Sequence, residues 1–237
     1  MLGSLFNKSS FGLDAGDGSI KFVELIDTKD GVRLGRHGEY KVHNKRELKE
    51  TFSALKKIFG SKPVHLSLGY QDKEKIKEHI LTLKNFGIKT KSSEHRTHAI
   101  GRSVIKKGDF GTYMLVNHGK EKSDIFIFSG GALVYHIPAS ASVYFLRDEI
   151  AKRFLHWHIK KGEEWENIRL PIKKIIVCGN APNLAEFVEH LALHLRHRVE
   201  TGNVWVNILD TSEHIPEIIL EESFDYASAL GAALKEF

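Results

Sequence analysis

The sequence predicts an α/β protein built from two similar lobes, each with the element order βββαβαβα. The first observation is an internal near-repeat, since FGLDAGDGSIKFVEL (11–25) and YMLVNHGKEKSDIFIF (113–128) share one plan. In both segments an apolar strand is followed by a polar residue, one further residue and a glycine, at Asp14–Gly16 and Asn117–Gly119. The second observation is that the same series of strand and helix patterns follows each copy. The third is the length of 237 residues, which suits two small lobes.

The first lobe is expected to begin with three strands joined by tight turns. The pair Asp30–Gly31 favours a hairpin before a strand at 31–42. A helix is expected at 45–59, because its apolar residues recur at three- and four-residue spacing. The pattern then predicts a strand at 63–70, a helix at 73–85, a strand at 88–91 and a helix at 94–106.

The second lobe repeats this order after the charged, glycine-bearing link at 106–112. Its predicted elements are a strand at 131–139, a helix at 142–161, a strand at 174–180, a helix at 183–198, a strand at 199–200 and a closing helix at 223–236. Meander-connected strands run antiparallel and helix-connected strands run parallel, so each lobe should hold a mixed sheet with helices on both faces. The expected division is 1–109, completed by 223–237, and 110–222. The glycine turns of the two lobes would then face a shared interlobe cleft.

Composition excludes several classes of protein. Hydrophobic residues make up 41% and charged residues 27%, which is typical of a globular chain. No apolar run is long enough to span a membrane, and one cysteine, Cys178, excludes an internal disulfide, so we expect a cytoplasmic protein. The net charge is +5, but lysines alternate with acidic residues, and we expect no nucleic-acid partner.

The glycine turns carry the chemistry that the sequence offers. Backbone N–H groups at Gly16, Asp17 and Gly18 can approach a phosphate, and Lys21 can add a charged contact. Asp14 could hold Mg²⁺ through water. An isolated turn of this composition is more often an ordinary hairpin, and it is the second copy that favours the phosphate interpretation. In IIVCGNAPN, Gly179 ends a buried strand before Asn180 and Ala181, with Pro182 opening a helix.

Other reactive side chains are weaker candidates. His190, His194 and His197 fall at helical spacing, but no carboxylate motif accompanies them, so we interpret them as a solvated or half-buried helix edge. Cys178 lies within an apolar strand and is expected to be an inert core residue.

Taken in order, DAGDGSIK, NHGKEKSD and VCGNAPN resemble the phosphate-1, phosphate-2 and adenosine motifs of the actin-like (ribonuclease H-like) ATPase superfamily. The opening FGLDAGDGSIKFVEL, VETGNVWVNI and the closing FDYASALGAALKEF are similar to the type IV pilus assembly protein PilM family, which is related to FtsA. The resemblance implies ATP or ADP with Mg²⁺ as ligand. Asp14 would organise Mg²⁺, and the second-copy position Asn117 would take part through water. Phosphates would be held at Gly16, Asp17, Gly18, Lys21, Gly119 and Lys120, and adenosine at Gly179, Asn180 and Ala181.

The chain departs from the family pattern in ways that bear on activity. Asn117 stands where the family has an aspartate, and its amide supplies no anionic oxygen to hold a metal or polarise water. Side chains at Asn180 and Ala181 replace glycines. The subdomain that the family inserts in its first lobe is missing, since Tyr70 leads almost directly into the helix at 73–85. We therefore expect weak nucleotide binding or a pseudo-ATPase.

The resemblance implies a cytoplasmic scaffold of type IV pilus assembly, held at the inner membrane by a PilN-type protein. The missing subdomain, which helps the family bind that partner, puts this docking mode in question. Two alternatives remain open at this stage. One is an FtsA- or MreB-like filament-forming protein, which leaves self-association open. The other is a small ATPase or kinase of the same superfamily, for which no catalytic carboxylate can be named.

Overall fold

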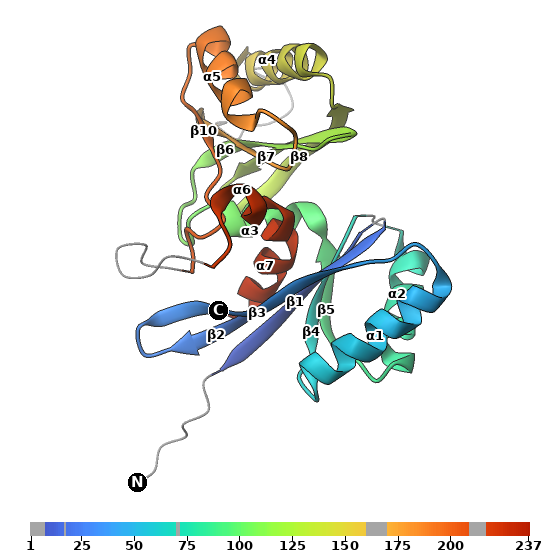
Figure 1. The fold of residues 1–237 in the computed structure, drawn as a ribbon. Helices are drawn as coiled ribbons and strands as arrows, with labels where there is room; N and C mark the ends of the chain where they lie inside the picture. Colours follow the sequence, from blue (N-terminus) through green and yellow to red (C-terminus); the bar gives the residue numbers. More distant parts are fainter. Residues whose placement is uncertain (1–7, 17, 70–71, 160–169, 209–216) are drawn as a thin grey trace. The chain divides into compact units, whose positions relative to one another are not determined.

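The computed structural model describes residues 8–16, 18–69, 72–159, 170–208 and 217–237. The chain divides into two compact units, one formed by 1–106 with 204–237 and the other by 107–203 (Figure 1). The sequence-based division assigned everything from 110 to 222 to the second lobe. The segment after Asn203 is held to the first unit instead, because the Asn207 side-chain amide donates to the carbonyls of Arg102 and Ile105, at 2.9 and 2.7 Å.

The first unit is built on a mixed five-stranded sheet, as predicted. Its strand order is β3-β2-β1-β4-β5. Strands β1, β2 and β3 form an antiparallel meander, whereas β4 and β5 run parallel to β1. The bounds are β1 Ser9–Gly16, β2 Ser19–Thr28, β3 Gly31–Lys41, β4 Val64–Leu68 and β5 Thr90–His95.

Helices cover both faces of this sheet (Figure 1). Helix α1 (Lys45–Phe59) and helix α2 (Lys73–Asn85) pack on one face over a core that includes Phe11, Leu13, Leu55 and Leu66. The Asn44 side chain caps α1 by accepting from two backbone N–H groups in its first turn, and Gly60, at φ 61°, ends it. Strand β4 ends at Leu68 and α2 begins at Lys73, which leaves no length for an inserted subdomain between them.

Helix α3 (Arg96–Val104) and helix α7 (Ala227–Ala233) occupy the other face, and two glycines let the backbones approach closely. A Cβ on Gly12 of β1 would lie 1.8 Å from the carbonyl oxygen of Ala229 in α7. A Cβ on Gly231 of α7 would lie 1.8 Å from the carbonyl oxygen of Ala99 in α3. The small residues of the C-terminal sequence therefore serve packing, and they fix where α3 lies relative to β1.

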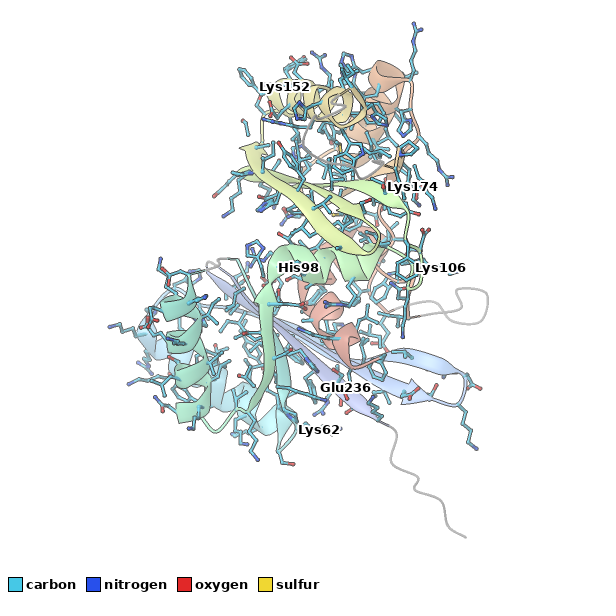
Figure 2. The ribbon with its side chains drawn as sticks, turned by 180° about the vertical axis from the view of Figure 1, so that it is seen from behind. Lys62, His98, Lys106, Lys152, Lys174 and Glu236 are labelled. Atoms are coloured by element: carbon cyan, nitrogen blue, oxygen red, sulfur yellow. The ribbon has the colours of Figure 1, made fainter. Side chains whose placement is uncertain are left out.

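The closing segment is not the single helix expected at 223–236. It runs as α6 (Leu220–Ser223), a 3₁₀ turn at 224–226, α7, and a second 3₁₀ turn at 234–236. At its end the Glu236 carboxylate, labelled in Figure 2, pairs with Lys91 and Lys8 and lies 3.2 Å from His65 Nε2. These contacts anchor the chain's last residues to β4, β5 and the start of β1.

The second unit repeats the plan around a sheet of order β10-β9-β6-β7-β8. Its strands are β6 Thr112–His118, β7 Lys122–Ser129, β8 Ala132–Ser140, β9 Ile172–Cys178 and β10 Val199–Thr201. Strands β6, β7 and β8 are antiparallel, and β9 and β10 are parallel to β6. Helix α4 (Val143–Ile159) and helix α5 (Leu184–Leu195) cover one face, where Leu146, Ile150, Phe187 and Leu191 are buried.

Helix α5 is shorter than expected at both ends. It begins at Leu184 rather than at 183, and Pro182 does not open it, because Asn183 takes a left-handed conformation at φ 58°. It ends at Leu195, where Arg196 is left-handed in turn. Among the described residues, no helix is long and apolar enough to cross a bilayer.

Candidate functional site: the two glycine turns

The turn after β1 brings together some of the residues that the sequence singled out. Asp14 is 8% exposed, and it lies directly opposite Lys21 in the antiparallel register of β1 and β2. Its side chain shares the face of Gly12, so it points toward the side of the sheet that α3 and α7 cover. Gly18 follows with φ 77°, a left-handed conformation that favours glycine. The expected phosphate contact at Asp17 lies outside the described residues.

A cation from a distant part of the chain already holds the Asp14 carboxylate. Arg96, the first residue of α3, donates from Nε and Nη2 to Asp14 Oδ1, at 3.3 and 3.0 Å. Mg²⁺ prefers anionic oxygens and keeps its remaining positions for water and phosphate. Asp14 is instead neutralised by a guanidinium, which would repel a divalent ion at the same oxygen. The residues at this turn therefore do not fit the magnesium ion that the resemblance implies.

Lys21 also has protein partners. Its Nζ lies 3.2 Å from Asp225 Oδ1 and 3.8 Å from Glu39 Oε1. The side chain is 14% exposed. Two carboxylates thus compete with any phosphate for this lysine, and its predicted phosphate contact stays a prediction.

The second turn, after β6, differs from the first in chemistry. Gly119 donates its N–H to the carbonyl of Lys122 at 3.1 Å, which closes the turn, and Lys120 is exposed. Asn117 lies opposite Asp124 in the register of β6 and β7. The carboxylate that faces Asn117 across the two strands is therefore that of Asp124, the last residue of NHGKEKSD. Asp124 Oδ1 lies 3.0 Å from His136 Nε2.

Gly179, predicted to approach adenosine, is required by packing within the second unit. It has φ 118°, and a Cβ there would lie 2.2 Å from the carbonyl oxygen of His118. Ala181 donates its N–H to that same carbonyl at 3.0 Å. The buried His118 ring reaches Ser123 Oγ at 2.9 Å, and burial lowers the pKa of this imidazole. The absence of a side chain at Gly179 thus allows the end of β9 to pack against the turn after β6. Asn180, the next residue, is exposed.

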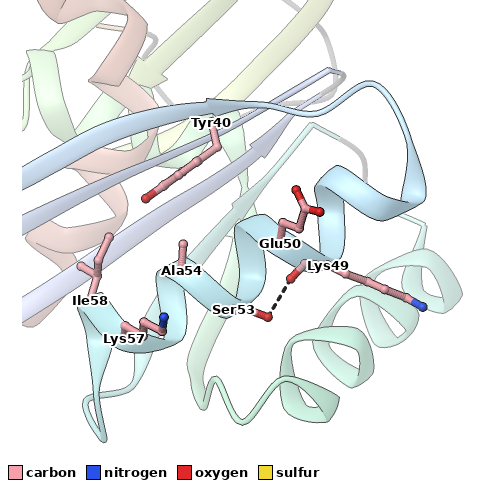
Figure 3. A pocket seen from close by; sticks show the side chains of 7 residues that line it. All are labelled: Tyr40, Lys49, Glu50, Ser53, Ala54, Lys57 and Ile58. Atoms are coloured by element: carbon pink, nitrogen blue, oxygen red, sulfur yellow. Dashed lines mark hydrogen bonds between the residues drawn. The ribbon is translucent and has the colours of Figure 1, made fainter.

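The weaker candidates are placed away from any cluster. His190 and His194 are exposed on α5, and no group of metal-ligating side chains is found among the described residues. Cys178 is a buried core residue of β9, and this burial raises the pKa of its thiol to about 12. A groove of about 590 Å³ lies between β3 and α1, lined by Tyr40 and six residues of that helix (Figure 3). It lies on the α1 face of the sheet, away from Asp14.

The residue that sequence reasoning missed is Arg96. One signal was present: Arg96 directly follows a strand and opens a helix whose first turn has no acidic residue. A cation at the first position of a helix is unfavourable to the helix dipole. Its placement there is explained by the Asp14 carboxylate, which it meets across the sheet.

The comparison with solved structures settles the fold. The solved PilM–PilN type IV pilus biogenesis complex superposes with a TM-score of 0.65 and 11% identity, covering 95% of this chain and 98% of that one. The chain has an actin-like fold. The ethanolamine utilization protein EutJ from Carboxydothermus hydrogenoformans superposes at TM-score 0.55 and 16% identity over 97% and 90%. A ROK family protein from Streptococcus pneumoniae TIGR4 gives 0.55 and 12% over 96% and 97%.

These identities show the fold alone. No protein-family model and no curated protein matches the sequence.

Proposed function

We propose that this actin-fold chain is a non-hydrolysing scaffold of the PilM kind. It would act in type IV pilus assembly on the cytoplasmic side of the inner membrane and bind ATP or ADP weakly. The observation that carries the non-hydrolysing part is the Asp14–Arg96 ion pair. A carboxylate neutralised in this way does not hold Mg²⁺, and the corresponding position of the second copy is Asn117.

Two further observations support the pilus context. The motif order and the closing FDYASALGAALKEF resemble the PilM family, and the PilM–PilN complex matches over nearly the whole of both chains. In that complex PilM is paired with PilN, and we propose a partner of the same type here. The chain would reach the membrane through that partner.

The partner is tested by capture from native membranes. The tagged full-length protein is incubated with detergent-solubilised membranes of its own host, crosslinked, and the bound proteins are identified by mass spectrometry. The same tag on an unrelated globular protein is the control. Enrichment of an inner-membrane pilus protein over the control supports the proposal, and recovery of soluble metabolic enzymes alone contradicts it.

The catalytic alternatives are tested on the purified protein. We expect phosphate release from Mg-ATP at the rate of the buffer blank. A turnover number of about 1 s⁻¹, at the low end of typical enzyme kcat values, would favour the small ATPase or kinase instead. Sedimentation with liposomes, or filaments in negative-stain images, would favour the FtsA- or MreB-like alternative.

A further inference from the structure

The Asp14–Arg96 pair lies where ligands commonly bind in open α/β sheets, at the carboxyl ends of parallel strands. Strands β1 and β4 run parallel, with Asp14 beside Ser67, and each ends close to a glycine, Gly16 and Gly69. A Cβ on Gly16 would lie 2.8 Å from Arg96 Nη2, and a Cβ on Gly69 would lie 3.5 Å from Arg96 Nη1. The guanidinium therefore lies against both strand ends, close to glycine backbone on either side.

Part of the guanidinium is committed to Asp14 and part is not. Nε and Nη2 donate to Asp14 Oδ1. For Nη1, the described part of the chain offers no acceptor within hydrogen-bonding distance, and the Arg96 side chain is 28% exposed. Asp14 thus orients a planar donor group, and Nη1, which lies beside Gly69, keeps its hydrogens for another acceptor. Arginine in such a position suits the paired oxygens of a phosphate.

The neighbouring cation does not compete for this role. Lys21 lies on the same face, but its ammonium is shared between Asp225 and Glu39. Of the two described cations at this turn, Arg96 is the one with a nitrogen, Nη1, that lies in no described ion pair or hydrogen bond.

We infer that Arg96 makes this turn a metal-independent oxyanion site, in which the guanidinium takes the place of Mg²⁺. The ligand class is a polyphosphate, free or as the tail of a nucleotide, and Asp14 acts as the positioning residue for Arg96. This deepens the proposed weak nucleotide binding and rests on it. A phosphate bound by arginine needs no divalent ion to neutralise its charge, so binding should occur without Mg²⁺ and should not be strengthened by it.

The first test uses the wild-type chain. Inorganic pyrophosphate and ATP are titrated calorimetrically, once with EDTA and once with excess Mg²⁺. We expect binding with EDTA that excess Mg²⁺ leaves unchanged or weakens, since no metal bridges protein and ligand and Mg²⁺ in solution neutralises part of the ligand's charge. Binding that Mg²⁺ strengthens by about tenfold or more, or no binding of either probe, overturns the inference. Neither result decides the scaffold role, which membrane capture tests separately.

The second test uses variants of the arginine. Arg96→Gln should weaken pyrophosphate binding by at least about tenfold, the effect of losing a charge-assisted hydrogen bond. The remaining binding should now be strengthened by Mg²⁺, because Asp14 is freed as a metal ligand, and a purely structural role of Arg96 would not produce this gain. Arg46→Gln removes the same charge from the exposed Arg46–Glu50 pair of α1 and should bind as the wild type does.

Arg96→Lys is a second variant for the case that Arg96→Gln does not fold. It keeps a cation near the buried Asp14. It should bind more weakly than the wild type, because lysine lacks the planar donor group. Unchanged affinity in a folded Arg96→Gln or Arg96→Lys protein contradicts the assignment.

Discussion

Gly12→Ala tests whether helix α7 packs directly on the backbone of β1, as the close contact at Gly12 indicates. The new Cβ would lie 1.8 Å from the carbonyl oxygen of Ala229 and 2.6 Å from the backbone N of Ala233. Carbon and oxygen need more than about 3 Å, so the helix must move by more than about 1 Å. Both obstacles are backbone atoms, and no side-chain rotation relieves them.

The expected cost follows from overpacking a well-packed core. Such insertions typically cost about 1–3 kcal/mol, and we expect the upper end because α7 is buried along its whole length. Alanine also has fewer backbone conformations than glycine in the unfolded chain, which offsets this loss of stability by about 0.4–1 kcal/mol. The net loss of about 2 kcal/mol in the free energy of unfolding lowers the melting temperature by roughly 4–8 °C for a chain of this size.

Thermal and urea unfolding, followed by far-UV circular dichroism, measure this loss. Gly35→Ala is the matched control, since it adds the same methyl group to β3 of the same sheet. Its Cβ meets side-chain atoms rather than backbone, namely Ile26 Cδ1 at 2.9 Å, Ile26 Cγ1 at 3.1 Å and Glu24 Cγ at 3.2 Å. Side chains can shift where backbone cannot, so we expect a smaller loss, of about 1 kcal/mol. If Gly12→Ala is as stable as Gly35→Ala, α7 does not pack on β1 as described and the placement of α3 with its Arg96 loses its support.

Three further predictions concern charge and reactivity. Hydrogen bonds from Lys91 and other cations lower the pKa of the Glu236 carboxyl from 4.5 to about 2, so its stabilisation is present above pH 4.5 and is lost as the pH falls toward 2. Glu236→Gln should therefore reduce stability in urea by about 1 kcal/mol at pH 7 and have little effect near pH 2; an equal loss at both pH values contradicts this. Cys178, whose pKa burial raises to about 12, should react with a thiol reagent only after denaturant is added, and rapid labelling of the folded protein would show that the β9 core is open. Asn117→Asp alone should not yield phosphate release from Mg-ATP, because Arg96 still neutralises Asp14; turnover in a malachite-green assay would show that Asn117 was the sole obstacle to hydrolysis.

Some features of the fold follow from sequence because they are local. The strand and helix order of both halves could be predicted, and α1 and α2 have the expected bounds. Their apolar residues recur at helical spacing, and capping residues such as Asn44 and Asp72 precede the first turn. Register in the meanders follows from turn glycines such as Gly31, at φ 112°.

The candidate site could be predicted only in part, because its charges meet across long separations in the chain. Asp14 was singled out by its place after a strand, but its partner Arg96 lies 82 residues further on. The local sequence around either residue does not predict that the two side chains are in contact. The same holds for Gly179, whose close neighbour is the His118 carbonyl.

The sequence by itself determined the duplicated strand–helix plan and the glycine turns, since hydrophobic period and turn chemistry act between near neighbours. Only the tertiary structure decided which charges those turns carry. The crossing of α7 over β1 and α3, made at Gly12 and Gly231, brings the start of α3 to the end of β1. Electrostatic attraction acts through space rather than along the chain, and so Asp14 meets a guanidinium there.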